Sequence, residues 1–351
     1  PTAVKVLPNF WVSEIMYFYV TKNFTAVTGY TSLLVLSTLG LFIFTLAIAD
    51  GIFYSTWITS LSIKSLTVKS LQLKNSIFSF GRPSFFSPQV EVMLKKEFWQ
   101  FIREPSQWIH FAVMMALLLI FLSSVSTLNI KLQTPELKAV VYLVVFIFNI
   151  FLINSLALRF GFPMMSLEGS AFWTIRSTPI TAAKVYWIKF AIVVIFLVAL
   201  SVIISWLSNI PYLYMQKVTG EQPWIYSFIE PSDTVKILSY FSMIVTPLIT
   251  ITLVSLNFGL GSVYSNFIEK NPIRIASSQG ATMTFLLSVV YLVFLLALYY
   301  FPATMLFTAE MKDLQPDWHM LRIVFFAICI PSAAIIAISH VVGLHSLKRD
   351  Y

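Results

Sequence analysis

Side chains that could perform chemistry are few in this sequence and lie far apart. Asp50 falls in the apolar run LAIADGIFYST, where a carboxylate inside lipid would indicate a proton or cation site. Neighbouring hydroxyl groups or interfacial water would satisfy it equally well, and we favour that interpretation. His319 lies near Asp313 and Asp317, but a solvated loop explains this group better than a metal site does.

The remaining candidates are equally weak. His110 and His340 each lie near the end of an apolar run, so we expect both at a membrane interface. His340 and His345 are five positions apart, which does not place them on one helix face. The sequence has no H-E-x-x-H motif, no Ser-His-Asp arrangement and no G-x-x-x-x-G-K-[ST] phosphate cradle. Its single cysteine, Cys329, permits no internal disulfide. We therefore expect no enzyme activity, no metal and no cofactor in this chain.

The amino-acid composition indicates whether the folded chain is surrounded by water or by lipid. Of 351 residues, 58% are hydrophobic and 11% are charged. A soluble domain carries about 25% charged residues. So few charges cannot cover a water-exposed surface, and we predict an integral membrane protein. The net charge of +8 then reflects topology and anionic lipid better than nucleic-acid binding.

Seven apolar stretches are long enough to span a membrane as helices, because a span needs about 20 residues. None alternates as a barrel strand would. We predict an all-α polytopic membrane protein with seven transmembrane helices at roughly 31–56, 107–128, 139–158, 188–208, 237–263, 282–301 and 322–344.

Lysine and arginine set the expected orientation. One alternating set of connections, counted with Lys189 at its boundary, carries 15 of the 23 cations. That set comprises segments 57–106, 159–187, 264–281 and 345–351. Cytoplasmic loops are enriched in these residues. We therefore expect this set and the C-terminus to be cytoplasmic, in a multi-pass protein of the plasma (inner) membrane.

The apolar pattern also divides the chain into parts. Residues 1–57 are predicted to end an upstream membrane half with its last span. The Ser- and Lys-rich segment 58–87 is predicted to be a cytoplasmic linker. Residues 88–345 form a six-span module, and 346–351 form a cytoplasmic tail. The chain begins at Pro1, and we interpret it as a piece of a longer protein.

The segment LKKEFWQFIREP precedes the first span of this module and is amphipathic. On a helix, one arc carries Leu94, Phe98, Phe101 and Ile102, and the other side carries Lys96, Glu97, Gln100, Arg103 and Glu104. Such a helix suits the plane of the interface, with the Lys95 ammonium reaching water. Pro105 disfavours helix at Glu104 and can begin the next helix. A plain basic anchor is the alternative role.

An in-plane helix followed by six spans resembles the permease domain of ABC-2 type exporters. LKKEFWQFIREPSQW is similar to the family's opening segment, with Glu104 in place of the more usual Asp. PMMSLEGSAFWTIRSTPITAAKVYWIKF (163–190) resembles a cytoplasmic loop of this family, and NPIRIASSQGATMTF (271–285) is a third similarity. LPNFW (7–11) is similar to a segment of the long, fused permeases.

The resemblance implies a partner ATPase that carries ATP and Mg²⁺, and a second permease module. That module would be either the upstream half of a longer protein or a second copy of this chain. It assigns a coupling helix to 164–180. Glu168 and Arg176 would offer charge to the ATPase, next to Gly169, and Phe172 and Trp173 would offer aromatic contacts. Those aromatic residues are equally suited to anchoring the loop in lipid head groups. Residues 94–104 would be the moving element, with Lys95, Lys96, Phe98, Arg103, Glu104 and Pro105 as its interfacial residues.

The function expected from this resemblance is ATP-driven export of an unidentified substrate. A non-transporting membrane scaffold and an ion-coupled transporter are the alternatives, and the latter would require Asp50.

Two glycines within a span, Gly259 and Gly261, are expected to permit close helix packing. Thr246, Thr250, Thr252 and Ser255 either line a passage or bond to their own helix, which is commoner.

Overall fold

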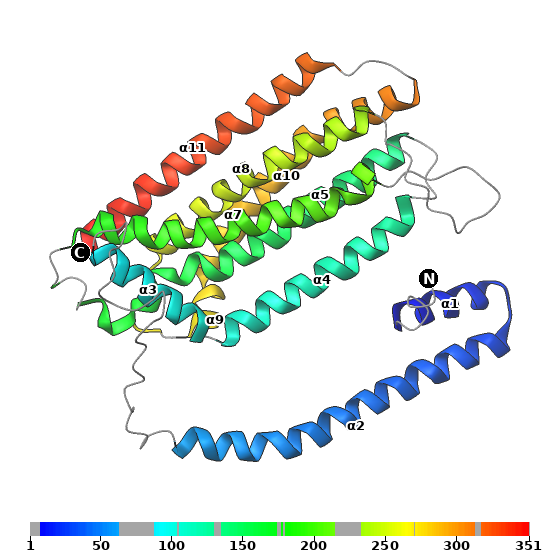
Figure 1. Ribbon diagram of the computed structural model, residues 1–351, viewed down its shortest axis with the longest axis horizontal. Coiled ribbons are helices and arrows are strands. Elements are labelled where there is room, and N and C mark those ends of the chain that lie inside the picture. The colour runs from blue at the N-terminus through cyan, green and yellow to red at the C-terminus, as the bar shows by residue number, and fades with distance from the viewer. Residues whose placement is uncertain are drawn as a thin grey trace. The chain divides into compact units, whose positions relative to one another are not determined.

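The fold was obtained as a computed structural model that describes residues 8–62, 88–103, 105–129, 135–173, 177, 180–214, 233–269, 271–312 and 317–350. All regular secondary structure within these ranges is helical (Figure 1). The elements are α1 (Pro8–Val20), α2 (Phe24–Ser62), α3 (Pro88–Arg103), α4 (Pro105–Asn129), α5 (Pro135–Phe160), η3 (Phe162–Met164), η4 (Ser166–Ala171), α7 (Ala182–Tyr214), α8 (Asp233–Val263), α9 (Pro272–Ala276), α10 (Gln279–Met311) and α11 (Trp318–Asp350).

Every predicted span coincides with a long helix. Six helices in the described ranges are long and apolar enough to cross a membrane, and they belong to α2, α5, α7, α8, α10 and α11. The remaining predicted span is α4, whose apolar stretch Trp108–Leu122 is shorter. The prediction of an all-α polytopic membrane protein is confirmed.

The chain divides into two compact units, 1–80 and 81–351. In the first unit, α1 and α2 are joined by a turn in which Lys22 has a positive φ of 58°. The Asn23 carboxamide oxygen accepts hydrogen bonds from the Thr25 hydroxyl at 2.8 Å and the Ala26 amide at 3.4 Å, which fixes the start of α2. Asp50 lies in α2, and its side chain is outside the described part. Of the predicted linker 58–87, α2 includes the residues up to Ser62, and the rest up to 87 is not described.

The second unit is built around α8. This helix packs against α5, α7, α10 and α11, while α4 packs against α5. One apolar core lies among α5, α8, α10 and α11, and includes Phe146, Ile249 and Tyr299. Another lies among α4, α5, α7 and α8, and includes Leu118 and Leu197. The apolar helices of this second unit therefore form a single packed bundle.

Two glycines in α8 permit close packing, as predicted. A Cβ atom on Gly259 would lie 2.5 Å from the backbone oxygen of Ser339 in α11. A Cβ on Gly261 would lie 2.2 Å from the backbone oxygen of Phe162 in η3. Both distances are far below van der Waals contact, so only glycine fits at either position. The second contact places the segment after α5 against the end of α8.

The hydroxyl-bearing residues of α8 bond to their own helix. Thr246, Thr250, Thr252 and Ser255 each donate to the carbonyl oxygen four residues earlier, at 2.7–3.0 Å. The commoner of the two predicted roles is therefore confirmed, because each hydroxyl proton is used within the helix.

The described parts of the cation-rich connections meet at one end of the bundle. The Phe172 ring stacks on Phe267, with centroids 4.7 Å apart. The Asn266 amide donates to the Ser166 hydroxyl oxygen at 3.0 Å. Leu347, near the C-terminal end of α11, shares an apolar cluster with Phe172. Figure 1 shows α3, α9 and the C-terminus at this same end of the unit.

Candidate functional site

The amphipathic helix α3 forms where the sequence predicts it. Pro88 occupies its first turn, and Glu91 complements the positive end of the helix dipole. The helix ends at Arg103, and Pro105 begins α4, as predicted from the proline. Glu104 is outside the described residues, as are the side chains of Arg103 and Pro105.

The face that α3 buries differs from the predicted one. Met93 and Glu97, one turn apart, are buried, and Met93 packs against Val185 and Ile188 of α7. The prediction that Glu97 lies on the water-facing side is wrong, because its side chain is only 3% exposed. Phe98, which belongs to the predicted apolar arc, is 41% exposed. The helix thus has one face fixed to the bundle.

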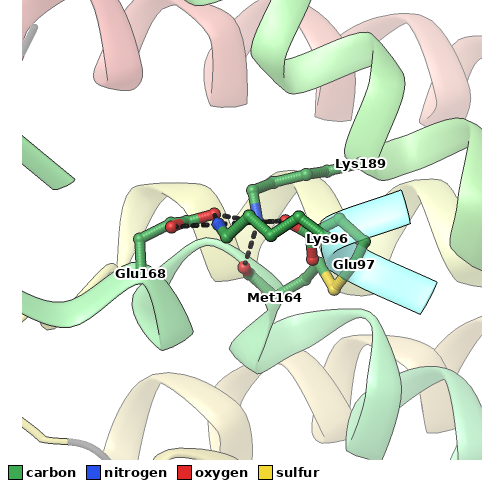
Figure 2. Close-up of polar contacts among 5 residues, drawn as sticks. All are labelled: Lys96, Glu97, Met164, Glu168 and Lys189. Atoms are coloured by element: carbon green, nitrogen blue, oxygen red, sulfur yellow. Dashed lines mark hydrogen bonds and ion pairs between the residues drawn. The ribbon is translucent and has the colours of Figure 1, made fainter. Parts of the chain in front are cut away.

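A cluster of four charged side chains holds α3, η4 and α7 together (Figure 2). The Lys189 ammonium lies 2.7 Å from a Glu97 carboxylate oxygen and 2.6 Å from a Glu168 carboxylate oxygen. It also donates to the backbone oxygen of Met164 at 3.3 Å. The Lys96 ammonium bonds both Glu168 oxygens and lies 3.4 Å from Glu97. We call Lys96, Glu97, Glu168 and Lys189 the charge cluster.

The electrostatics of the charge cluster are balanced. Its two ammonium groups and two carboxylates sum to no net charge. Glu97, Glu168 and Lys189 have side chains no more than 4% exposed, whereas Lys96 is 41% exposed. A buried charge is tolerated only when it is paired and hydrogen-bonded. Removing any one of the three buried members would therefore leave an uncompensated charge.

Lys95 lies just outside the cluster. Its ammonium pairs with Glu91, one turn earlier on α3. Its side chain is 11% exposed, so the ammonium is more enclosed than the interfacial position predicted for it. This pair supports the helix locally rather than joining it to another element.

The loop residues predicted to meet an ATPase are divided between the interior and the surface. Glu168 is buried in the charge cluster, and Phe172 is 5% exposed against Phe267, so the expected surface position of these two side chains is wrong. Trp173 is 67% exposed and remains the accessible member. Gly169 has a φ of 56° and a ψ of −147°, which a side chain would strain. Arg176 is outside the described residues.

His340 and His319 each have a hydrogen-bonded neighbour in the structure. His340, expected at an interface, is 7% exposed, and its Nδ1 lies 2.9 Å from the Tyr186 hydroxyl. Asp317 accepts a bond from the His319 amide at 2.9 Å at the start of α11, while Asp313 is not described. Among the described residues, no group of three or more His, Cys, Asp or Glu could hold a metal ion.

The ion pairs of the charge cluster connect α3, η4 and α7, so a displacement of one element would be passed to the other two. The charge cluster joins two segments of the connecting end to a membrane helix. Sequence reasoning overlooked two of its members, Glu97 and Lys189. A lone lysine within the apolar run YWIKFAIVV was a usable signal, because buried lysines require a carboxylate partner.

Comparison with known proteins gives the family. The family model described as "Putative ATP-binding cassette" matches residues 2–350. No curated protein matches the chain. A match over nearly the whole length, together with an all-helical membrane bundle, shows that the chain belongs to this family and is a multi-pass membrane component of an ABC transporter system.

Proposed function

We propose that this chain is the permease of an ABC exporter and moves its substrate with ATP hydrolysed by a separate ATPase subunit. Family membership and the bundle of apolar helices support this role. The sequence carries no phosphate cradle of the P-loop type, so ATP and Mg²⁺ would be bound by the partner. A second permease module would complete the transport path.

The charge cluster is the observation that carries the proposal. A partner that pushes on the surface around Trp173 would move η4, and through Glu168 it would move Lys189 in α7. Because Lys189 also holds Glu97, α3 would follow the same displacement. Glu168 therefore acts within the chain, as the link between the docking surface and the membrane helices. The face with α3 and η4 would be cytoplasmic.

Trp173 is the residue through which docking is tested. Exposed tryptophans are frequent hot spots of protein interfaces, where truncation costs about 2 kcal/mol or more, equivalent to roughly a 30-fold loss of affinity. We expect a P-loop ATPase to co-purify with the full chain from its native membrane. Trp173→Ala should lower the retained ATPase by about that factor.

Trp206→Ala is the matched control, because Trp206 is also exposed, at 48%, but lies in the spanning part of α7. It should retain the ATPase fully. Purification of an intact complex without any ATPase would favour the scaffold role. Equal retention by the two tryptophan variants would contradict docking through Trp173.

A further inference from the structure

One face of α8 is polar along most of its length. Five residues form it, and we call them the α8 polar stripe: Ser239, Ser242, Thr246, Thr250 and Asn257. They recur at helical spacing and are at most 3% exposed. From position 239 to 257 the stripe is about 27 Å long at 1.5 Å per residue. The hydrocarbon core of a bilayer is about 30 Å thick, so the stripe extends over most of it.

Polar residues of α5 and α7 face this stripe. The Asn209 amide nitrogen donates to Ser242 at 3.4 Å, and its oxygen accepts from the Tyr142 hydroxyl at 3.1 Å. Ser205 lies 3.5 Å from the Thr246 hydroxyl. The stripe is therefore buried between three helices and is not directed towards lipid.

Several buried polar atoms of α5 and α8 have no hydrogen-bond partner among the described residues, including one of Asn149, whose amide nitrogen donates to the Ser208 hydroxyl of α7 at 2.7 Å. They are Asn149 Oδ1, Asn154 Nδ2, Asn257 Oδ1 and Ser239 Oγ. The Asn257 amide nitrogen donates to the Leu253 carbonyl at 2.8 Å and to Asn154 Oδ1 at 3.0 Å, which fixes the orientation of both amides. One acceptor and one donor consequently remain open at this pair.

The chemistry of the missing partner follows from these atoms. Buried polar groups in native proteins are nearly always paired with protein groups or ordered water, and the surrounding lipid offers them no hydrogen-bond partner. The open atoms include acceptors and a donor, so the partner must both donate and accept. Segments 139–158, 190–214 and 237–263 contain no Asp, Glu, Lys or Arg, so a charged partner would have no counter-ion. A neutral hydroxyl oxygen meets both conditions.

We propose that the α8 polar stripe and the facing amides of α5 bind neutral hydroxyl oxygens within the membrane. Two sources share this chemistry: water, and the hydroxyl groups of a neutral head group on the transported molecule. The second source rests on the proposed function, whereas the first does not.

Hydroxyl-radical footprinting of the full chain in lipid nanodiscs tests the proposal, because bound water generates radicals where it lies. Tyr142 is the reporter, since it is 3% exposed and bonds to Asn209. Tyr186 is the control, because it is 0% exposed and its hydroxyl pairs with His340 of α11. We expect Tyr142 to be oxidised several-fold faster than Tyr186. Equal, slow oxidation of both tyrosines would overturn the proposal.

A neutral alkyl glucoside added to the nanodiscs separates the two sources. Slower oxidation of Tyr142 would support binding of a hydroxyl-bearing head group. Unchanged oxidation would support water as the bound species. Neither measurement requires an ATPase, so a failure here is distinguishable from a failure of the proposed transport function.

A variant pair then locates the binding atoms. Asn149→Leu keeps the branching of the side chain and removes both polar atoms, so Tyr142 oxidation should fall towards the Tyr186 rate. Ser255→Ala is the control on the opposite side of α8, where the hydroxyl already donates to Ile251, and it should change nothing. Asn257→Leu is a second variant should the first fold poorly. If Asn149→Leu and Asn257→Leu both raise the thermal midpoint of unfolding and leave the rate of Tyr142 oxidation unchanged, binding at these two amides is contradicted.

Discussion

Replacing Lys189 by methionine removes the cation that joins α3 to η4. Glu97 and Glu168 would keep their negative charges in a site where both are almost fully buried. Lys96 would be the remaining cation of the charge cluster, and its side chain is 41% exposed. The cluster would therefore change from neutral to a net charge of −1.

The expected loss of stability can be stated as a magnitude. Breaking a buried ion pair by removing one partner costs about 3–5 kcal/mol. For a domain of this size, each kcal/mol shifts the thermal midpoint by about 2–4 °C. Lys189→Met should therefore unfold about 6–20 °C below the parent chain. Thermal unfolding in nanodiscs, followed by tryptophan fluorescence, measures this shift.

The double variant Glu97→Gln with Lys189→Met tests the electrostatic cause. It restores a neutral site that still contains the Lys96–Glu168 pair, so it should recover at least half of the lost stability. Lys348→Met, at an exposed lysine of α11, controls for removing a cation. If Lys189→Met is no less stable than Lys348→Met, or if the double variant is worse than the single one, the charge-balance argument is refuted.

Three further predictions concern packing. Gly259→Ala should lower the free energy of unfolding by about 1–3 kcal/mol, because the new Cβ atom would force α8 away from α11. Gly40→Ala is its control: the Cβ atom would meet no atom within 4 Å, so this variant should stabilise α2 by up to about 1 kcal/mol. Gly169→Ala should cost about 1–3 kcal/mol, because its backbone conformation excludes a side chain. Phe172→Ala should cost about 3–5 kcal/mol, whereas Trp173→Ala should stay within about 0.5 kcal/mol of the parent. Thermal unfolding of each variant checks these values. Equal midpoints for the Gly259 and Gly40 variants, or for the Phe172 and Trp173 variants, would contradict the packing described at Gly259 or Phe172. An unchanged midpoint for Gly169→Ala would contradict the backbone argument.

The sequence was most informative where a local rule decides the structure. Apolar length determined the spans, and Pro105 determined where one helix ends and the next begins. Gly259 and Gly261 indicated close packing, because small residues within a membrane span typically lie where two backbones approach each other. Each of these rules depends on near neighbours in the chain, so tertiary contacts did not change the outcome.

The buried faces could not be predicted in the same way. Amphipathic analysis assigns every charge to water, so it placed Glu97 outside, although Lys189 pairs with it from 92 positions further along the chain. Phe172 was predicted to contact a partner protein or lipid head groups, but the Phe267 ring, from the connection after α8, stacks on it. In both cases the decisive partner comes from a distant segment, and a single sequence does not identify such partners.

The two polar regions of the bundle differ in how readily their helices could separate. At the charge cluster, ion pairs of 2.6–2.7 Å join separate elements, and breaking one exposes a buried charge. Along the α8 polar stripe, the contacts to α7 are long, at 3.4–3.5 Å, and the Thr246 and Thr250 hydroxyls bond to their own helix. Parting α8 from α7 would therefore leave most stripe hydrogen bonds intact, and it would expose oxygens that hydroxyl groups can satisfy. Under the proposed transport function, we expect the movement to keep α3, η4 and α7 together and to open the bundle along the α8 polar stripe.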